Sequence, residues 1–233
     1  MLKNFLLIIL YPLFGHSIFA QVGMNLPNFD RRKFHIGASL SLNTADYRYQ
    51  FSPGVYNGDS INYIQVNKTP GFTFAMVGSL DISPLFHLRF LPGFSITERV
   101  FNYGELKNNE LVFSGTRLES FFLDFPLILK LRTKRINNFA AYGITGVQYG
   151  LDLATQSGVE TVPGERIMKM KRHDFSSIFG GGFDFFMMYY KLSLEVKINN
   201  GFKDLLIQEH TFFSSPLSSL KTKVWTFSII FEG

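Results

Sequence analysis

The sequence predicts an all-β fold: an eight-stranded antiparallel transmembrane β-barrel with short periplasmic turns and long extracellular loops. Three observations predict it. Several long segments alternate between apolar and polar residues with the two-residue period of a β-strand. The chain begins with a segment typical of exported proteins, and no later segment is apolar enough for a membrane-spanning helix. The connections between the alternating segments are long and short in turn, which is typical of outer-membrane barrels.

The clearest strand is the segment 120–132, which is long enough to cross a membrane, because a tilted barrel strand needs about 9–11 residues. One parity is entirely apolar: Phe121, Leu123, Phe125, Leu127, Leu129 and Leu131. The other parity contains every charged residue of the segment. It includes Phe122, Asp124, Pro126, Ile128, Lys130 and Arg132. Strands of soluble sandwiches also alternate but are nearer ~5–6 residues long. The length therefore favours a membrane strand.

Residues 1–20 have the pattern of a secretory signal peptide. Lys3 supplies the positive charge, Phe5–Phe14 is the apolar core, and Ala20 is a suitable residue before the cleavage site. A retained membrane anchor is the alternative, but the apolar run is shorter than the ~18–20 residues that a span needs. We expect residues 21–32 to form a periplasmic N-terminal segment and residues 33–233 to form the barrel.

Seven further segments alternate in the same way and complete the set of eight strands. They are 34–43, 71–82, 86–97, 139–153, 173–186, 191–199 and 223–231. Polar, turn-rich stretches predict long loops at 44–69, 98–115, 154–172 and 200–220, and short turns at 83–84, 133–138 and 187–189. An exported chain has its mature N-terminus in the periplasm, so the first connection must be extracellular, and it is long.

Two prolines do not fit regular strands. Pro92 and Pro126 lie inside predicted strands, although proline cannot donate a hydrogen bond and a closed barrel has no free edge. We expect a bulge or an irregular hydrogen-bond ladder at each. A soluble sandwich or lipocalin-like barrel is the alternative fold, but its outer face would carry charge more densely. Here the polar parity is small and sparsely charged, whereas the apolar parity is rich in phenylalanine and leucine.

With the apolar parity facing lipid, the polar parity points into the barrel. The predicted interior residues carry both signs of charge: His35, Asp81, His87, Arg89, Asp124, Lys130, Asp174, Asp184, Glu195 and Lys197. An eight-stranded barrel is only wide enough for side chains to fill it. Buried charges must be paired, so we expect these residues to pair across the interior. A conducting pore is disfavoured, because aqueous channels belong to larger barrels.

The composition excludes several other functions. The net charge of +5 is spread out, with short basic runs only at 31–33 and 169–172, so no nucleic-acid partner is expected. The absence of cysteine excludes disulfides and thiolate catalysis. Gly180–Gly182 lies inside a predicted strand and precedes no helix, so it is not a phosphate-binding loop. We expect no cofactor, no metal and no small-molecule substrate.

Catalysis is also disfavoured. His173 and Asp174 are neighbours on a strand and point to opposite faces, so they cannot act as a dyad. His210 lies near Ser214 and Ser215 in a predicted loop, where chance proximity is the simpler explanation. No hydrolase or metalloprotease motif occurs. We therefore expect a non-enzymatic protein without catalytic residues.

The long loops are left as the place of function, because binding residues are concentrated on loops of rigid scaffolds. Aromatic residues of the first and fourth predicted loops are candidates for partner contacts: Tyr47, Tyr49, Phe51, Tyr56, Tyr63, Phe212 and Phe213. Aromatic enrichment is typical of protein-contact surfaces. It is equally typical of the aromatic girdle at the membrane interface of a barrel.

Several motifs resemble a known group of proteins. The segment 118–130, reading LESFFLDFPLILK, resembles the signature of small outer-membrane β-barrel proteins common in Bacteroidetes-type genomes. AYGITGVQYG at 141–150, FGGGF at 179–183 and LSLEVK at 192–197, with Gly201, continue the resemblance. Within that superfamily, NFDRRKFHIG at 28–37, LNTAD at 42–46 and VWTFSIIFE at 224–232 are similar to the PorT (SprT) subfamily.

That resemblance implies an outer-membrane component of the type IX secretion system, which moves C-terminally signalled proteins across the outer membrane. The implied partners are outer-membrane lipid, the large translocon barrel and other components of that system. No catalytic residue is carried over from the family. A general adhesion or envelope-integrity barrel of the OmpX type and an enzyme with a site at the barrel rim are the alternatives.

Overall fold

In the computed structural model, the structure describes residues 23–51, 61–107, 110–154, 170–207 and 217–233. Only the main chain is described at residues 49, 51, 61–68, 98–107 and 110–119. The predicted signal peptide lies outside the described residues. Within them, no helix has both the length and the apolar character needed to cross a membrane.

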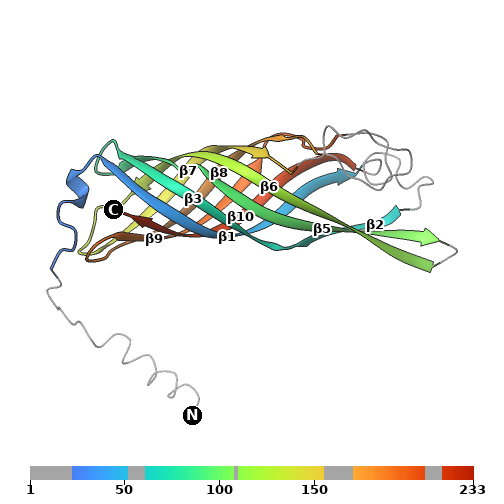
Figure 1. Cartoon of the computed structure of the whole chain (residues 1–233), viewed down its shortest axis with the longest axis horizontal. Coiled ribbons are helices and arrows are strands. Elements are labelled where there is room, and N and C mark those ends of the chain that lie inside the picture. Colours follow the sequence, from blue (N-terminus) through green and yellow to red (C-terminus); the bar gives the residue numbers. More distant parts are fainter. Residues whose placement is uncertain (1–22, 52–60, 108–109, 155–169, 208–216) are drawn as a thin grey trace, which may run out of the picture.

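The described chain consists of strands joined into one antiparallel ring (Figure 1). The elements are η1 (Phe29–Arg31), β1 (Phe34–Phe51), β2 (Ile61–Lys68), β3 (Pro70–Asp81), β4 (Phe86–Phe90), β5 (Gly93–Lys107), β6 (Glu110–Arg132), β7 (Phe139–Asp152), β8 (His173–Phe186), β9 (Lys191–Gly201) and β10 (Leu217–Glu232). β2 and β3 together form one barrel strand, and so do β4 and β5. The ring therefore has eight barrel strands, and β1 closes it by pairing with both β10 and β3. The predicted eight-stranded barrel is confirmed.

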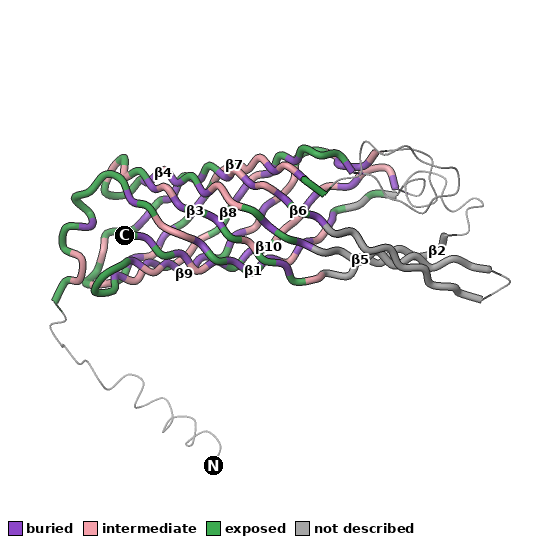
Figure 2. The backbone as a smooth tube through the Cα atoms, viewed as in Figure 1, coloured by how far each residue is buried: buried purple, intermediate pink, exposed green. Residues whose placement is uncertain are grey.

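Exposure alternates along the strands, as Figure 2 shows. In β6, Leu127, Leu129 and Leu131 are exposed on the outer face, whereas Ile128 and Lys130 are buried inside. The outer face of the barrel is an apolar band, formed among others by Phe72, Phe74, Phe94, Phe121, Phe179, Phe183, Trp225 and Phe227. A soluble protein would bury such a surface. The band is therefore the lipid-facing wall, and the fold is a transmembrane barrel.

The outer ends of several strands are longer than predicted. β1 runs to Phe51, and β2 occupies part of the predicted loop 44–69. β5 and β6 form a hairpin through the predicted loop 98–115. Figure 1 shows β2, β5 and β6 continuing together beyond the rest of the barrel. Segments outside the membrane need no apolar outer face, so their composition does not show the alternation that marks a membrane strand.

The two prolines interrupt the hydrogen-bond ladder without a bulge. The pairing of β4 and β5 with β6 keeps one register from Phe90↔Leu127 to Gly93↔Asp124. Each proline keeps its carbonyl in the ladder and lacks only its donor. Leu91 N–H donates to Pro126 O at 3.2 Å, and Met76 N–H donates to Pro92 O at 2.9 Å. Of the two expected outcomes, the irregular ladder is correct.

The two ends of the barrel differ. The connections 82–85, 133–138 and 187–190 are short and lie at the same end as the C-terminus and the N-terminal segment (Figure 1). Outer-membrane barrels place their short turns in the periplasm, so this end is periplasmic. The extension of β2, β5 and β6 is then on the outer side of the membrane.

Candidate functional site in the barrel interior

The structure places all ten predicted interior residues on the inward face of the barrel. All of them are buried except Asp81, which is partly buried. They separate into three groups along the barrel axis. A histidine–aspartate group lies at the periplasmic end, an ion-pair network fills the middle, and a polar cavity lies toward the outer end.

The ion-pair network is centred on Arg89 of β4. Its Nη1 lies 2.8 Å from Glu195 Oε2 of β9, and its Nη2 lies 3.5 Å from Glu232 Oε1 of β10. Lys191 pairs with the other oxygen of Glu232. An isolated buried charge is very costly, but a paired and hydrogen-bonded one is tolerated. One buried cation therefore links β4 to the neighbouring strands β9 and β10, which lie far from it in the sequence.

A second ion pair lies beside the first. Lys130 Nζ donates to both oxygens of Asp184 at 2.8 Å, and the Ser193 hydroxyl donates to Asp184 Oδ1 at 2.6 Å. The Lys130 ammonium also lies 3.6 Å from the centre of the Tyr142 ring. Tyr142 in turn donates to Glu195 at 3.1 Å. The interior at this level is filled by side chains that form ion pairs and hydrogen bonds across the barrel.

The sequence prediction missed two members of the network, Lys191 and Glu232. Both are inward-facing by strand parity, since Lys191 shares the parity of Glu195 and Glu232 follows the outward Phe231. Lys191 is the first residue of β9 and Glu232 is the last residue of β10, so each has alternating neighbours on one side only. Extending the parity of each strand to its last residue would have found them.

Glycines in β8 make room for these side chains. A Cβ at Gly182 would lie 2.2 Å from Leu194 O and 2.6 Å from the Tyr142 hydroxyl, and one at Gly180 would lie 2.4 Å from Val196 O. No other residue fits without displacing the main chain of β9. The Gly180–Gly182 run is therefore explained by close packing of the barrel wall.

At the periplasmic end, Asp81 lies between two histidines. His87 Nδ1 is 2.5 Å from Asp81 Oδ1, and His35 Nε2 is 3.4 Å from Asp81 Oδ2. The ring of Phe29 stacks on His35 with centroids 3.9 Å apart and meets Phe186 edge-on at 5.7 Å. The N-terminal segment thus inserts an aromatic side chain into the barrel end.

The rest of this segment is fastened to the same end. Asp30 accepts from Arg132 at 2.8 Å, and Arg135 donates to the Asn25 carbonyl and packs over the Phe186 ring. The segment 25–31, with Phe29 at its centre, is called the periplasmic plug below. The expected periplasmic N-terminal segment is therefore folded onto the barrel and closes it.

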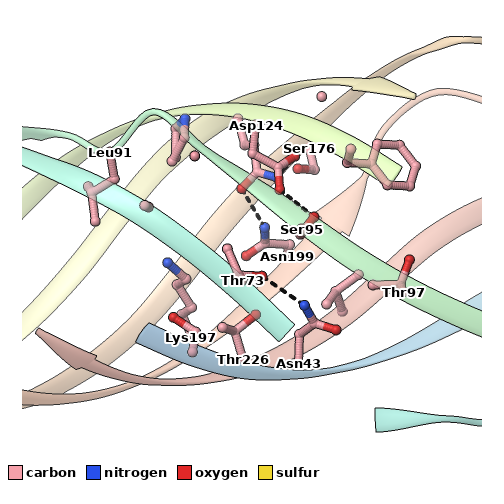
Figure 3. Close-up of a pocket in the computed structure, with 18 of the residues that line it drawn as sticks. Asn43, Thr73, Leu91, Ser95, Thr97, Asp124, Ser176, Lys197, Asn199 and Thr226 are labelled. Carbon is pink, nitrogen blue, oxygen red and sulfur yellow. Dashed lines mark hydrogen bonds between the residues drawn. The ribbon is translucent and has the colours of Figure 1, made fainter. Parts of the chain in front are cut away.

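Toward the outer end the interior contains a small polar cavity of about 70 Å³ (Figure 3). Asp124 accepts from Ser95 and from Gln148, both at 2.8 Å, and Asn43 donates to Thr73 at 2.7 Å. Buried oxygens of Asn43, Thr97 and Asn199 have no partner within the described part of the chain. A water needs about 10–15 Å³ of such space and two to four polar partners. The cavity can therefore hold a few waters.

Apolar residues close the barrel above this cavity. The outer closure consists of Tyr47, Met170, Leu205, Leu206, Leu217 and Leu220, all buried. Met170 and Leu206 form an isolated β-bridge, and Lys171 N–H donates to Leu205 O at 2.8 Å. The segments 170–172 and 204–207 thus fold back over the barrel mouth. Between the outer closure and the periplasmic plug, side chains fill most of the interior.

The aromatic residues predicted to contact partners are mostly not in loops. Tyr47 lies in β1, is buried, and donates from its hydroxyl to Met170 Sδ at 3.2 Å, so it belongs to the outer closure and not to a contact loop. The prediction for Tyr47 was wrong because β1 continues past the membrane. Tyr49 and Phe51 also lie in β1, and Tyr63 lies in β2. Tyr56, Phe212 and Phe213 lie outside the described residues.

His173 and Asp174 do not form a dyad. His173 is exposed and its Nδ1 lies 2.7 Å from the Tyr149 hydroxyl, whereas Asp174 points inward and accepts from Thr222 at 2.7 Å. His210, Ser214 and Ser215 lie outside the described residues. Across the described ranges, no group of three or more His, Asp or Glu side chains could hold a metal ion.

A closed eight-stranded barrel with a lipid-facing apolar band and a charge-paired interior defines a small outer-membrane barrel protein. The sequence comparison agrees with this class. The chain belongs to the family of the outer membrane protein beta-barrel domain, whose sequence model matches residues 19–206. The protein is therefore located in the outer membrane. No curated protein sequence matches the chain.

Solved structures of small outer-membrane barrels are similar to this chain over most of its length. OprG from Pseudomonas aeruginosa is 14% identical, with a TM-score of 0.49, and the match covers 86% of this chain and 94% of that one. Neisserial surface protein A is 9% identical, with a TM-score of 0.44 and coverage of 84% and 95%. Ail of Yersinia pestis, solved with a heparin analogue, is 11% identical, with a TM-score of 0.41 and coverage of 87% and 100%.

Proposed function

We propose that this barrel is a non-enzymatic component of the type IX secretion system, needed for export of C-terminally signalled proteins and acting through contacts with other proteins. The observation that carries the contact role is the filled interior. Arg89, Glu195 and Glu232 occupy the middle of the barrel, and Phe29 and Met170 lie in its two closures. A polypeptide cannot pass through such a barrel, so its role must lie on its outer surfaces.

The secretion pathway is supported by the motifs that resemble the PorT subfamily. The motif at 28–37 contains Phe29 of the periplasmic plug and His35 of β1, which stack on each other. The motif at 118–130, which resembles the wider superfamily and not PorT in particular, contains Asp124 and Lys130, which bond to residues of the polar cavity and to Asp184. The motifs that carry the resemblance therefore include residues that make specific contacts inside the barrel, as well as residues of the lipid-facing wall.

The proposal is tested by deleting the gene and measuring C-terminally signalled proteins in the culture medium and in the periplasm. We expect the cargo to accumulate in the periplasm, and a plasmid copy of the gene to restore its release. Normal release by the deletion strain would overturn the proposal. An unrelated outer-membrane barrel should be assembled normally in the same strain, which separates a secretion defect from a general envelope defect.

A second candidate is an OmpX-like barrel that serves adhesion or envelope integrity. The extension of β2, β5 and β6 beyond the membrane favours it, because an exposed sheet is suited to contacts outside the cell. The same deletion strain distinguishes the two candidates. Sensitivity to detergent or loss of surface attachment with unchanged cargo release would support the second.

A further inference from the structure

The strand pairing on one side of the barrel ends near the outer surface of the membrane. β1 pairs with β3 from Phe34↔Leu80 to Thr44↔Pro70, which is about the length that a membrane-crossing strand needs. Beyond this point the continuation of β3 is β2, and β2 pairs only with β5 among the described strands. Its other edge therefore has no strand partner within the described residues. This edge, from Ile61 to Lys68, is called the β2 edge below.

The register identifies the main-chain groups of the β2 edge. Met76 N–H donates to Pro92 O, and Leu91 N–H donates to Pro126 O. Even-numbered residues of the β4–β5 barrel strand therefore bond toward β3, and odd-numbered residues bond toward β6. The register of β5 with β6 does not shift as far as Lys107↔Glu110, so the same parity holds along the whole of β5.

It follows that Val100, Asn102 and Gly104 bond toward β2. Their partners there are Asn67, Gln65 and Tyr63. Residues of a strand bond alternately to the two sides. The N–H and C=O groups of the intervening residues, Ile64, Val66 and Lys68, are therefore directed to the β2 edge.

Between Tyr63 and Asn67 the β2 edge lacks the devices that protect edge strands, because the register shift of β2 against β5 lies between Ile61 and Tyr63, at the outer end of the strand. Natural sheets blunt their edges with proline, bulges, inward charges and lysine. The sequence 61–68, INYIQVNK, contains no proline, and its only charge is Lys68 at the end near the membrane. Tyrosine, isoleucine and valine favour the strand conformation. Such an edge is a template for an added strand.

An apolar hollow lies just below the edge on the lipid-facing wall. It has a volume of about 400 Å³ and is lined by Leu40, Leu42, Phe72, Phe74, Phe94, Ile96, Phe227 and Ile229. Leu42 and Phe72 are opposite each other in the register, two positions from the end of the β1–β3 pairing. A protein embedded in the same membrane can cover this hollow and reach the β2 edge with an extended segment.

We propose that the β2 edge receives an extended segment of another outer-membrane protein by antiparallel main-chain pairing. A second copy of this chain is a poorer occupant. β2 continues along the long axis of the barrel (Figure 1), so the β2 strands of two copies in one membrane point the same way. They could pair only in parallel, which is less stable per residue. A segment of another protein has no such constraint.

Amide hydrogen exchange, resolved to single residues by mass spectrometry, tests the proposal without knowledge of the partner. We compare outer-membrane fragments washed with carbonate, which removes peripheral proteins, with the purified chain in lipid nanodiscs. We expect the amides of Ile64, Val66 and Lys68 to be protected in the membrane fragments and to lose protection after purification. Those of Gln65 and Asn67, which bond to β5, should stay protected in both.

Three results would overturn the proposal. The edge amides could exchange at the same rate in both samples. They could lose protection on carbonate washing, which would point to a soluble occupant. They could gain protection in the purified sample as its concentration rises, which would point to a second copy.

A matched pair of variants links the protection to main-chain pairing. Val66→Pro removes one donor of the β2 edge without removing a bond to β5, whereas Val66→Thr keeps the donor and the branched shape. In membrane fragments Val66→Pro should abolish the protection of Ile64 and Lys68, and Val66→Thr should preserve it. Equal protection in both variants would contradict strand addition. The inference deepens the proposed contact role, yet the exchange experiment and the secretion assay can fail independently.

Discussion

Arg89 of β4 and Glu195 of β9 meet at the centre of the barrel, with Arg89 Nη1 2.8 Å from Glu195 Oε2 and both side chains fully buried. Glu232 lies on the other side of the same guanidinium, with 3.5 Å between Arg89 Nη2 and Glu232 Oε1. One arginine therefore pairs with two carboxylates from neighbouring strands, and Lys191 supplies a second cation to Glu232.

Replacing Arg89 with methionine should destabilise the barrel strongly. The variant leaves Glu195 without its nearest cation and Glu232 with only Lys191, and removal of one partner from a buried pair costs about 3–5 kcal/mol. The measurement is urea unfolding of the barrel in lipid vesicles, followed by the shift between folded and unfolded bands in cold gel electrophoresis.

A control for Arg89 is Lys33→Met, since Lys33 is exposed and exposed charges contribute little. The double variant Arg89→Met with Glu195→Gln should recover part of the loss, because it removes one uncompensated charge. Equal stability of Arg89→Met and the unmodified protein would show that the interior is not held by this ion pair.

Replacing Phe29 with alanine should release the periplasmic plug and leave the barrel folded. Phe29 is the buried residue of η1, and it contacts His35 and Phe186 by ring stacking and edge packing. Local opening should expose Arg31 and Arg32 to trypsin, because protease sensitivity follows the free energy of local opening. The measurement is the rate of trypsin cleavage after these residues, with the barrel band in gel electrophoresis as the reference.

Met24→Ala is the control for Phe29, since Met24 is exposed. It should leave the cleavage rate unchanged. Unfolding of the whole barrel by Phe29→Ala would instead mean that the plug and the barrel form one cooperative unit.

The single tryptophan should report the depth of the outer border of the membrane. Trp225 is 50% exposed on the outer face of β10 and pairs with Thr44, where β1 and β3 cease to pair. Tryptophan is typical of the interface region of barrels. Its fluorescence should be quenched by lipids brominated near the headgroup more strongly than by lipids brominated near the chain end. Absence of quenching by either would contradict the lipid-facing assignment of this wall.

The barrel should not form a steady channel. Arg89, Lys130 and their partners fill the middle, and the cavity of about 70 Å³ near Asp124 ends at the outer closure. In planar lipid bilayers we expect no stable conductance step from the unmodified protein, under conditions in which a larger porin conducts. A reproducible open state would mean that the closures move apart in the membrane.

Much of the barrel could be predicted from local alternation. The two-residue period is a property of the backbone, so Leu127, Ile128, Leu129 and Lys130 could be assigned to faces without knowing any partner strand. The interior positions followed from the same rule. Their pairing partners did not, because Arg89 and Glu195 are brought together by ring closure and not by their spacing in the sequence.

The features that could not be predicted from local alternation depend on where a segment lies relative to the membrane and to distant parts of the chain. The polar residues after Asn43 predict a loop at Tyr47, although β1 continues there without a lipid-facing side. The bridge between Met170 and Leu206 joins two segments that carry no strand pattern, and the stacking of Phe29 on His35 joins such a segment to β1. Such contacts are visible only when the ring is closed.

The link from Glu195 through Arg89 to Glu232 also constrains biogenesis. β4 enters the ring early in the chain order, whereas β9 and β10 are the last strands to join it. Until they do, the Arg89 guanidinium lacks both of its carboxylate partners, and a half-built sheet would expose it to hydrocarbon. Delivery of single hairpins into the bilayer one after another is therefore excluded on energetic grounds. The nascent sheet must be kept in a hydrated, protected site until β1 pairs with β10 and closes the barrel. A cellular insertion factor can provide such a site.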